Sequence, residues 1–122
     1  MRTRYEDIPT YVTKDGSRIK ELMHPDAHAV KNQSFAEATV PPGIKTNLHY
    51  HQQSEELYII FAGIGDMTLG DQTFRVNPGD TICISPNTPH CIFNCGDDEL
   101  RFFCACSPAY SHEDTVLVQP DA

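Results

Sequence analysis

The sequence predicts an all-β protein, a sandwich or barrel, on the strength of two observations. Short runs of strand-compatible residues follow one another at even spacing between residues 34 and 107, with Gly, Pro and Asn clusters between them. No segment in that range sustains the period of an amphipathic helix. A chain of 122 residues without an internal repeat or linker is expected to form a single domain, residues 1–122, with its core at about 34–107.

The strand boundaries follow from turn signals and from runs of β-branched, aromatic and other apolar residues. We expect residues 1–15 to pair along a sheet edge or to pack on another subunit, and residues 107–115 to be irregular. The expected strands are 18–24, 34–40, 45–51, 56–62, 80–85, 90–94, 100–106 and the two arms of a hairpin at 66–76 that turns at Gly70-Asp71.

The charge of the chain argues against two classes of partner. The formal net charge is -8, so the domain is a poor partner for nucleic acid or for an anionic membrane surface. No apolar run approaches the length of a transmembrane helix, and the first residues, MRTRYEDIPT, lack the apolar core of a secretory signal. We therefore expect neither a nucleic-acid nor a membrane partner.

The cysteines favour a reducing compartment. The chain has 5 cysteines, an odd number, and no expected secretory signal, so free thiols and a cytoplasmic location are the best interpretation. Cys104 and Cys106 are separated by one residue, which is not the spacing of a zinc or redox C-x-x-C motif.

The stretch HYHQQSEE, residues 49–56, suggests a metal site. In a strand, His49 and His51 project from the same face. The QQS break lets the chain turn, so that a following glutamate can return over that face. Alternation along the next strand puts Glu56 with Tyr58 and Ile60 on one face and Glu55 on the other. Two imidazoles and a carboxylate suit a divalent Fe, Mn, Ni, Zn or Cu ion; the alternative is a solvated edge strand.

A second segment offers a third imidazole. Residues 78–94, PGDTICISPNTPHCIFN, contain a glycine turn, a strand and a tight Pro/Asn loop that leads to His90 at the start of another strand. A loop of this kind could aim His90 towards the first two histidines, which favours the metal site over the solvated edge.

The two segments together resemble the signature motifs of the small single-domain cupins. The first motif, G-x5-H-x-H-x3,4-E-x6-G, is matched by Gly43, His49, His51, Glu56 and Gly63. The second, G-x5-P-x-G-x2-H-x3-N, is matched by Gly79, His90 and Asn94, whereas Ser85 and Asn87 stand at its proline and second glycine. Asn tolerates the left-handed conformation that glycine supplies there, so we expect His90 to keep its place.

The resemblance covers about residues 34–107 and implies a double-stranded β-helix, a jelly-roll-like barrel. It further implies that one divalent transition metal binds inside the barrel to His49, His51, Glu56 and His90. Glu56 is the matching glutamate because six residues separate it from Gly63.

The resemblance leaves the reaction open, because cupins include oxidases, isomerases, lyases and binding proteins. We favour a metal-dependent oxidoreductase of dioxygenase type acting on a small organic molecule. A cupin isomerase, lyase or decarboxylase is the alternative, together with a non-catalytic sensor of a small molecule.

Further residues are candidates for the pocket, each with a structural alternative. Tyr58 is a candidate acid or hydrogen-bond donor, or else a core aromatic. Lys45 and Asn47 share the strand parity of the histidines and are candidate substrate contacts, although a lysine at a strand end is often solvated.

Cys104 is a candidate substrate contact if its face points inward, and otherwise a small apolar filler. Tyr110 and His112 are candidates for a group that gates the barrel mouth, with His112 a candidate catalytic residue; as an alternative, both lie on the surface of a tail or dimer contact.

The apolar content of residues 56–70, ELYIIFAGIGDMTLG, exceeds what one barrel interior accommodates. We therefore expect a two-fold homodimer.

Overall fold

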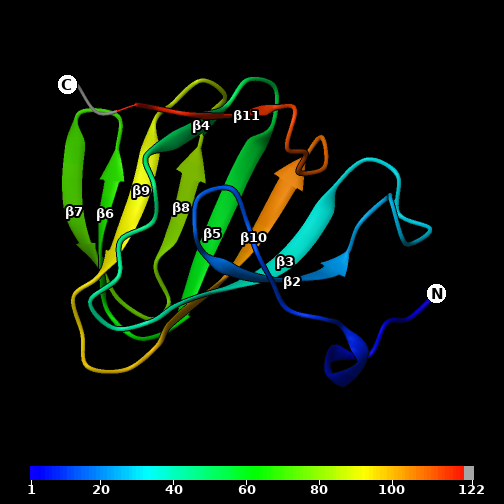
Figure 1. The fold of residues 1–122 in the computed structure, drawn as a ribbon, viewed down its shortest axis with the longest axis horizontal. Helices are drawn as coiled ribbons and strands as arrows, with labels where there is room; N and C mark the ends of the chain where they lie inside the picture. Colours follow the sequence, from blue (N-terminus) through cyan, green and yellow to red (C-terminus); the bar gives the residue numbers. More distant parts are fainter. Residues whose placement is uncertain (120–122) are drawn as a thin grey trace.

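Two antiparallel sheets form the protein (Figure 1). The computed structural model describes residues 1–119. One sheet has six strands in the order β1-β2-β3-β10-β5-β8, and the other has five in the order β11-β4-β9-β6-β7. The elements are η1 (Tyr5–Asp7), β1 (Tyr11–Val12), β2 (Arg18–Met23), β3 (Ser34–Val40), β4 (His49–His51), β5 (Glu55–Ala62), β6 (Gly65–Leu69), β7 (Gln72–Val76), β8 (Thr81–Ile84), β9 (His90–Asn94), β10 (Leu100–Ser107) and β11 (Thr115–Leu117).

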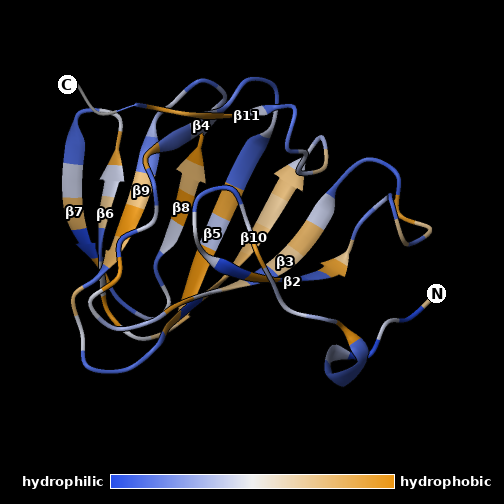
Figure 2. Cartoon of the chain, in the orientation of Figure 1, coloured by the Kyte–Doolittle hydropathy of each residue, from blue (hydrophilic) through white to orange (hydrophobic). Residues whose placement is uncertain are grey.

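The all-β prediction is confirmed, and the alternation of the strands explains the core. Along β5 the side chains of Glu56, Tyr58 and Ile60 are buried, whereas Glu55 and Leu57 face solvent. Strand β10, which pairs with β5 and β3 in the middle of the six-stranded sheet, alternates in the same way. Figure 2 shows β8, β9 and β10 largely in hydrophobic colours and the loops mostly in hydrophilic ones.

Two predictions about turns are confirmed. Strands β6 and β7 form a hairpin over Gly70-Asp71, with Gly70 at a φ of 61°. Asn87 adopts a φ of 64°, the left-handed conformation expected at the second glycine of the motif. His90 therefore begins β9, as expected.

The strand expected at residues 45–51 is shorter than predicted. The alternation of buried and exposed side chains also breaks before residue 49. Only β4 is regular, while Lys45 forms an isolated bridge to Phe93. The amide of Asn47 donates to the carbonyl of Asp15 at 2.7 Å rather than to a neighbouring strand. As a result Thr46 is buried, and Lys45 and Asn47 are exposed. The alternation that holds within β4 does not extend to these residues.

The ends of the described chain join the barrel. Strand β1 pairs with β2 at the edge of the six-stranded sheet, which is one of the two expectations for residues 1–15. Of the expected irregular segment 107–115, residues 108–114 are irregular, whereas Ser107 ends β10 and Thr115 begins β11. Strand β11, which the sequence did not predict, follows them and pairs with β4. Among residues 1–119, no helix is long and apolar enough to cross a membrane.

The outer face of the six-stranded sheet is apolar. Leu57, Ile59 and Phe61 on β5 are 44%, 43% and 37% exposed. Phe103 on β10 stacks between Phe61 and Phe35, with ring centroids at 4.5 and 5.4 Å. Leu57, Ile59 and Phe61 account for much of the apolar content of residues 56–70 that the barrel interior does not accommodate.

Gly63 should be the glycine most sensitive to a methyl group. It has a φ of 85°, and an added Cβ would lie 2.6 Å from the carbonyl oxygen of Glu99 and 2.8 Å from Cα of Leu100. Gly43 has a similar φ of 76°, but nothing lies within 4 Å of its added Cβ. Gly43→Ala should cost only backbone strain, about 1–2 kcal/mol. Gly63→Ala should lose about 1–3 kcal/mol more through overpacking.

Chemical denaturation of the metal-free proteins measures both free energies of unfolding. Equal losses for the two variants would contradict the close approach of residues 63 and 99.

Candidate metal centre

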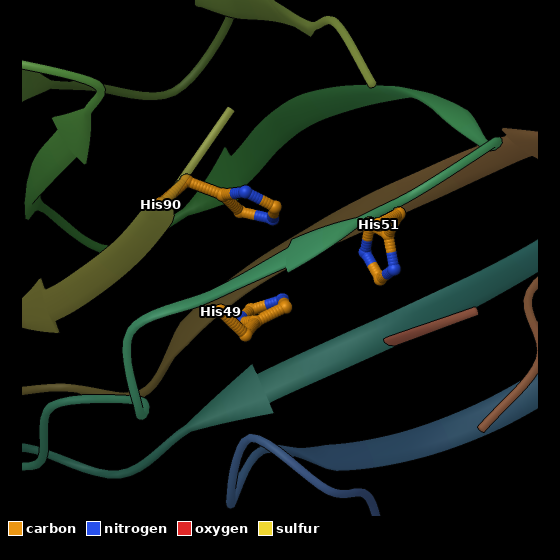
Figure 3. Close-up of side chains that lie close together, drawn as sticks. All are labelled: His49, His51 and His90. Carbon is orange, nitrogen blue, oxygen red and sulfur yellow. The ribbon is translucent and has the colours of Figure 1, made fainter. Parts of the chain in front are cut away.

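Three buried histidines from two adjacent strands point towards one another (Figure 3). His49 and His51 lie on the inner face of β4, and His90 begins β9, where it is the register partner of His49. One nitrogen from each ring lies within 4.8 Å of the others. The ring centroids of His49 and His90 are 4.2 Å apart.

Hydrogen bonds fix the tautomer of each imidazole. The Nδ1 atoms of His49 and His90 face the carbonyl oxygens of Asn47 and Thr88 at 2.8 and 2.9 Å. A carbonyl oxygen can only accept, so both Nδ1 atoms carry the hydrogen and both Nε2 atoms carry a lone pair.

The tautomer of His51 is fixed by a hydroxyl group instead of a carbonyl. The Thr115 hydroxyl donates to the carbonyl of Ser111 at 2.8 Å, so it accepts from Nδ1 of His51 at 3.0 Å. All three Nε2 lone pairs are therefore directed into the barrel. Donation of Nδ1–H to a protein acceptor is the usual arrangement of a metal-binding histidine.

Glu56 on β5, in the facing sheet, approaches two of the three rings. Its Oε1 lies 3.2 Å from Nε2 of His51 and 3.4 Å from Nε2 of His90. Its Oε2 accepts from the thiol of Cys106 at 3.2 Å. Burial alone would raise the pKa of Glu56, but the two neighbouring imidazoles, in their protonated form, donate to the carboxylate, outweigh burial and hold that pKa below its usual range.

The chemistry of this donor set calls for a cation. A carboxylate oxygen and two Nε2 lone pairs are all acceptors, and within residues 1–119 Nε2 of His90 has no hydrogen-bond partner. Either a proton or a metal ion can satisfy these acceptors. At His49, burial and the neighbouring His90 lower the pKa and oppose protonation, which favours a metal ion beside that ring. Three imidazole nitrogens and a carboxylate oxygen could hold a divalent transition metal.

His49 and His51 open into a cavity of about 40 Å³, which has room for a few water-sized groups. Both sheets, the turn before β2 and the segment before β11 line it. The lining side chains are Tyr11, Thr13, Asp15, Ser17, Ile19, Glu21, Ser34, Ala36, Ala38, His49, His51, Glu56, Tyr58, Phe102, Cys104, Cys106, Tyr110 and Thr115.

Comparison with known proteins identifies the family. Residues 36–106, more than half of the chain, match the family described as Cupin domain. The chain belongs to the cupin family. The matched residues lie within the expected core of 34–107 and confirm the resemblance seen in the two motifs.

Two relatives of this cupin cover most of its length, and one of them has a name that states a ligand. An uncharacterized protein of Methanocaldococcus jannaschii is 50% identical over 119 residues, which cover 98% of this chain and 95% of that protein. An oxalate-binding protein of Thermotoga maritima is 31% identical over 83 residues, which cover 68% of this chain and 64% of that protein.

Solved structures support the same fold. A predicted oxalate decarboxylase of Thermotoga maritima superimposes with a TM-score of 0.77 at 24% identity, over 88% of this chain and 99% of that one. The Streptomyces nucleoside dehydratase Pac13 superimposes with a TM-score of 0.80 at 17% identity, over 98% of this chain and 91% of that one. Both share the double-stranded barrel that the sequence predicts for this cupin.

The structure places Tyr58 and Cys104 in the cupin cavity. Both side chains are buried among its lining residues, and the ring of Tyr58 also packs on Phe102 at 4.5 Å. Burial and the charge of Glu56 raise the pKa of Tyr58 and of Cys104. Both groups are therefore neutral hydrogen donors at neutral pH.

Lys45 and Asn47 lie outside this cavity. Their exposed side chains line a separate surface hollow with Leu48 and β11. They point outward because the alternation of buried and exposed side chains breaks before β4. Asn47 still contributes to the site through its backbone, because its carbonyl orients the imidazole of His49.

The C-terminal pair is divided between the cavity and the surface. Tyr110 lines the cavity, and its ring lies 5.9 Å from that of His51. His112 is exposed and does not line the cavity, but its Nδ1 lies 3.1 Å from the Tyr110 hydroxyl. Burial raises the pKa of Tyr110 to about 12.

The sequence analysis missed the contribution of the N-terminal hairpin. Tyr11 from β1, Asp15 from the turn and Glu21 from β2 all line the cavity. The inward parity of Ile19 and Glu21 could have signalled the last of these, since Ile19 is the apolar residue of an alternating segment. The turn residues carry no such signal.

Glu21 should make the stability of the protein depend on pH. Burial is the main cause that raises its pKa from 4.5 to about 7. The folded state then binds this proton more tightly than the unfolded state does, so the free energy of unfolding should fall as the pH rises between these values. In Glu21→Gln this contribution is absent.

The difference in unfolding free energy between Glu21→Gln and wild type should therefore grow in favour of the variant from about pH 4.5 to about pH 7 and then level off. Denaturant titrations of both metal-free proteins across this range measure it. Parallel pH profiles would show that Glu21 does not titrate in this way.

Proposed function

We propose that this single-domain cupin is an enzyme that binds one divalent transition metal through His49, His51, Glu56 and His90. The observation that carries the proposal is the fixed tautomer of the three rings. Each Nδ1–H is used by a protein acceptor, so in the neutral rings three Nε2 lone pairs converge with one carboxylate oxygen, and only a proton or a metal ion can lie between them.

The donor set leaves open which of the first-row metals binds, because Fe, Mn, Ni, Zn and Cu all accept imidazole and carboxylate. When bound, such an ion would act as a Lewis acid that polarises an oxygen of the substrate. The small cavity favours a small organic molecule as substrate.

The protein groups around the site favour proton transfer over oxygen chemistry. Tyr58, Tyr110 and Cys104 are neutral donors at the cavity wall, and Glu21 can exchange a proton near neutral pH. We therefore place lyase or decarboxylase chemistry first and the dioxygenase that the sequence favoured second. The names of the decarboxylase and dehydratase structures that share this fold agree with this order.

Tyr58 and Cys104 are the residues proposed to contact the substrate. Tyr58 would hold or supply a proton at its hydroxyl, and Cys104 would shape the wall. Lys45, Asn47 and His112 have no place in this proposal, since their side chains lie outside the cavity.

Metal content tests the ligand set. His51→Ala and His90→Ala should lose the metal on dialysis, because each removes a lone pair that no neighbour replaces. Glu56→Gln should bind more weakly, since it removes a negative charge. Glu55→Gln is the matched control, because its side chain is exposed on the other face of β5. Elemental analysis of untagged, dialysed protein measures the outcome.

Retention of metal by Glu56→Gln and its loss by Glu55→Gln would reverse this assignment.

An oxygen electrode then separates the two reaction classes. Turnover of small keto acids and dicarboxylates without oxygen uptake would support the lyase, whereas uptake coupled to turnover would support the dioxygenase. Metal binding without turnover of any substrate would favour the sensor.

We also propose a cytoplasmic homodimer that forms through the apolar outer face of the six-stranded sheet. The exposed Leu57, Ile59 and Phe61 support this proposal, because isolated monomers rarely expose several large apolar side chains side by side. The cytoplasmic location rests on the 5 free cysteines, of which Cys83 is exposed.

Ile59→Lys should dissociate this dimer, because it buries a charge in the middle of the contact. Gln72→Lys adds the same charge at an exposed position on β7 and serves as the control. Light scattering at micromolar concentration should give half the wild-type mass for Ile59→Lys alone. A monomer mass for the wild type would rule out the proposed contact.

A further inference from the structure

The turn between β1 and β2 lies against the candidate metal centre and is tied down on two sides. The carbonyl of Asp15 accepts from the amide of Asn47 at 2.7 Å, just before β4. The amine of Lys14 donates to the carbonyls of Thr115 and His112 at 2.7 and 3.2 Å. The turn is thus held next to two segments that orient the histidines.

The two oxygens of the Asp15 carboxylate have different environments. Oδ1 accepts from the Thr13 hydroxyl at 2.6 Å, the Ser17 amide at 2.9 Å and the Ser17 hydroxyl at 2.7 Å. Ser17 is only 3% exposed, so these donors hold the carboxylate firmly. Oδ2 lies 3.6 Å from Nε2 of His49, inside the cavity.

This contact pairs two acceptors. Nε2 of His49 carries a lone pair, because its Nδ1 donates to the carbonyl of Asn47. A carboxylate held beside a lone pair is unfavourable unless a cation lies between them. Asp15 thus places a carboxylate beside His49, as Glu56 does beside His51 and His90.

The distance fits a shared metal. Ligand atoms that lie about 2.0–2.2 Å from one ion are roughly 3–4 Å from one another. The 3.6 Å from Oδ2 of Asp15 to Nε2 of His49 falls in that range, as do the 3.2 and 3.4 Å from Glu56 to His51 and His90. Only the three imidazoles have nitrogens that all lie within 4.8 Å of one another, so an ion shared by all five side chains requires a small inward shift of both carboxylates.

We propose that Asp15 is a second carboxylate ligand of the metal, supplied by the β1–β2 turn. The inference rests on the proposed metal site, and it adds a ligand from outside residues 36–106, where the cupin match lies. Two carboxylates and three neutral imidazoles neutralise a divalent ion, whereas Glu56 alone leaves one positive charge. The fifth ligand also leaves fewer positions for the substrate.

Asp15→Asn tests the proposal with little change in shape. The asparagine oxygen can still accept from Thr13 and Ser17, and its amide can donate to Nε2 of His49. The variant should bind Co²⁺ roughly 10–100-fold more weakly than wild type, with an altered visible spectrum. In the metal-free form it should be at least as stable as wild type, because a repulsive contact becomes a hydrogen bond.

Asp97→Asn removes the same charge from the exposed turn between β9 and β10 and is the control. Titration with Co²⁺, followed by visible absorption, and denaturation of the metal-free proteins give the two readouts. Unchanged Co²⁺ affinity and spectrum in Asp15→Asn would overturn the proposal and leave Asp15 as a turn-forming residue. Equal Co²⁺ binding by wild type and His90→Ala would overturn the metal site itself, and the role of Asp15 with it.

Discussion

Three hydrogen bonds from imidazole Nδ1 atoms are the constraint on which the site depends. Their acceptors are the carbonyls of Asn47 and Thr88 and the hydroxyl of Thr115. Each acceptor lies in a segment that departs from regular strand geometry or ends it. The irregular residues before β4, the loop that contains Asn87 and the start of β11 all serve to aim a ring. Much of what makes this barrel irregular is therefore explained by the need to turn three lone pairs inward.

This arrangement has a cost in the metal-free protein. Glu56 is almost fully buried, and its only described hydrogen donor other than a histidine is the thiol of Cys106, a weak donor. Buried acceptors that face one another contribute nothing favourable to folding and lower stability until a cation neutralises them. The apolar core beneath them, with Phe102 and Ile60 fully buried, must supply the stability that the site removes.

Local patterns predicted most of the fold and the centre of the site. Alternation placed Glu56 inward and Glu55 outward, and the spacing of two segments brought His90 towards His49 although the two are far apart in sequence. The prediction was wrong for Lys45 and Asn47, because a tertiary hydrogen bond from Asn47 to Asp15 ends the strand early. No periodicity records such a bond. The same reason hid the contribution of the N-terminal hairpin to the cavity, since its turn residues have no apolar pattern, and it hid the pairing of β4 with β11.

The short strand β4 has a weak connection to the rest of its sheet. It pairs with β9 through a single registered pair, His49 and His90, and otherwise with β11 over three residue pairs. Strands with few pairing partners open before the core does, in local unfolding that leaves the remaining sheet intact. Amide hydrogens of β4 and β11 should thus exchange ahead of those of β5 and β10. Such opening would expose the histidines without unfolding the barrel, which gives a buried site a route for the entry and exit of an ion.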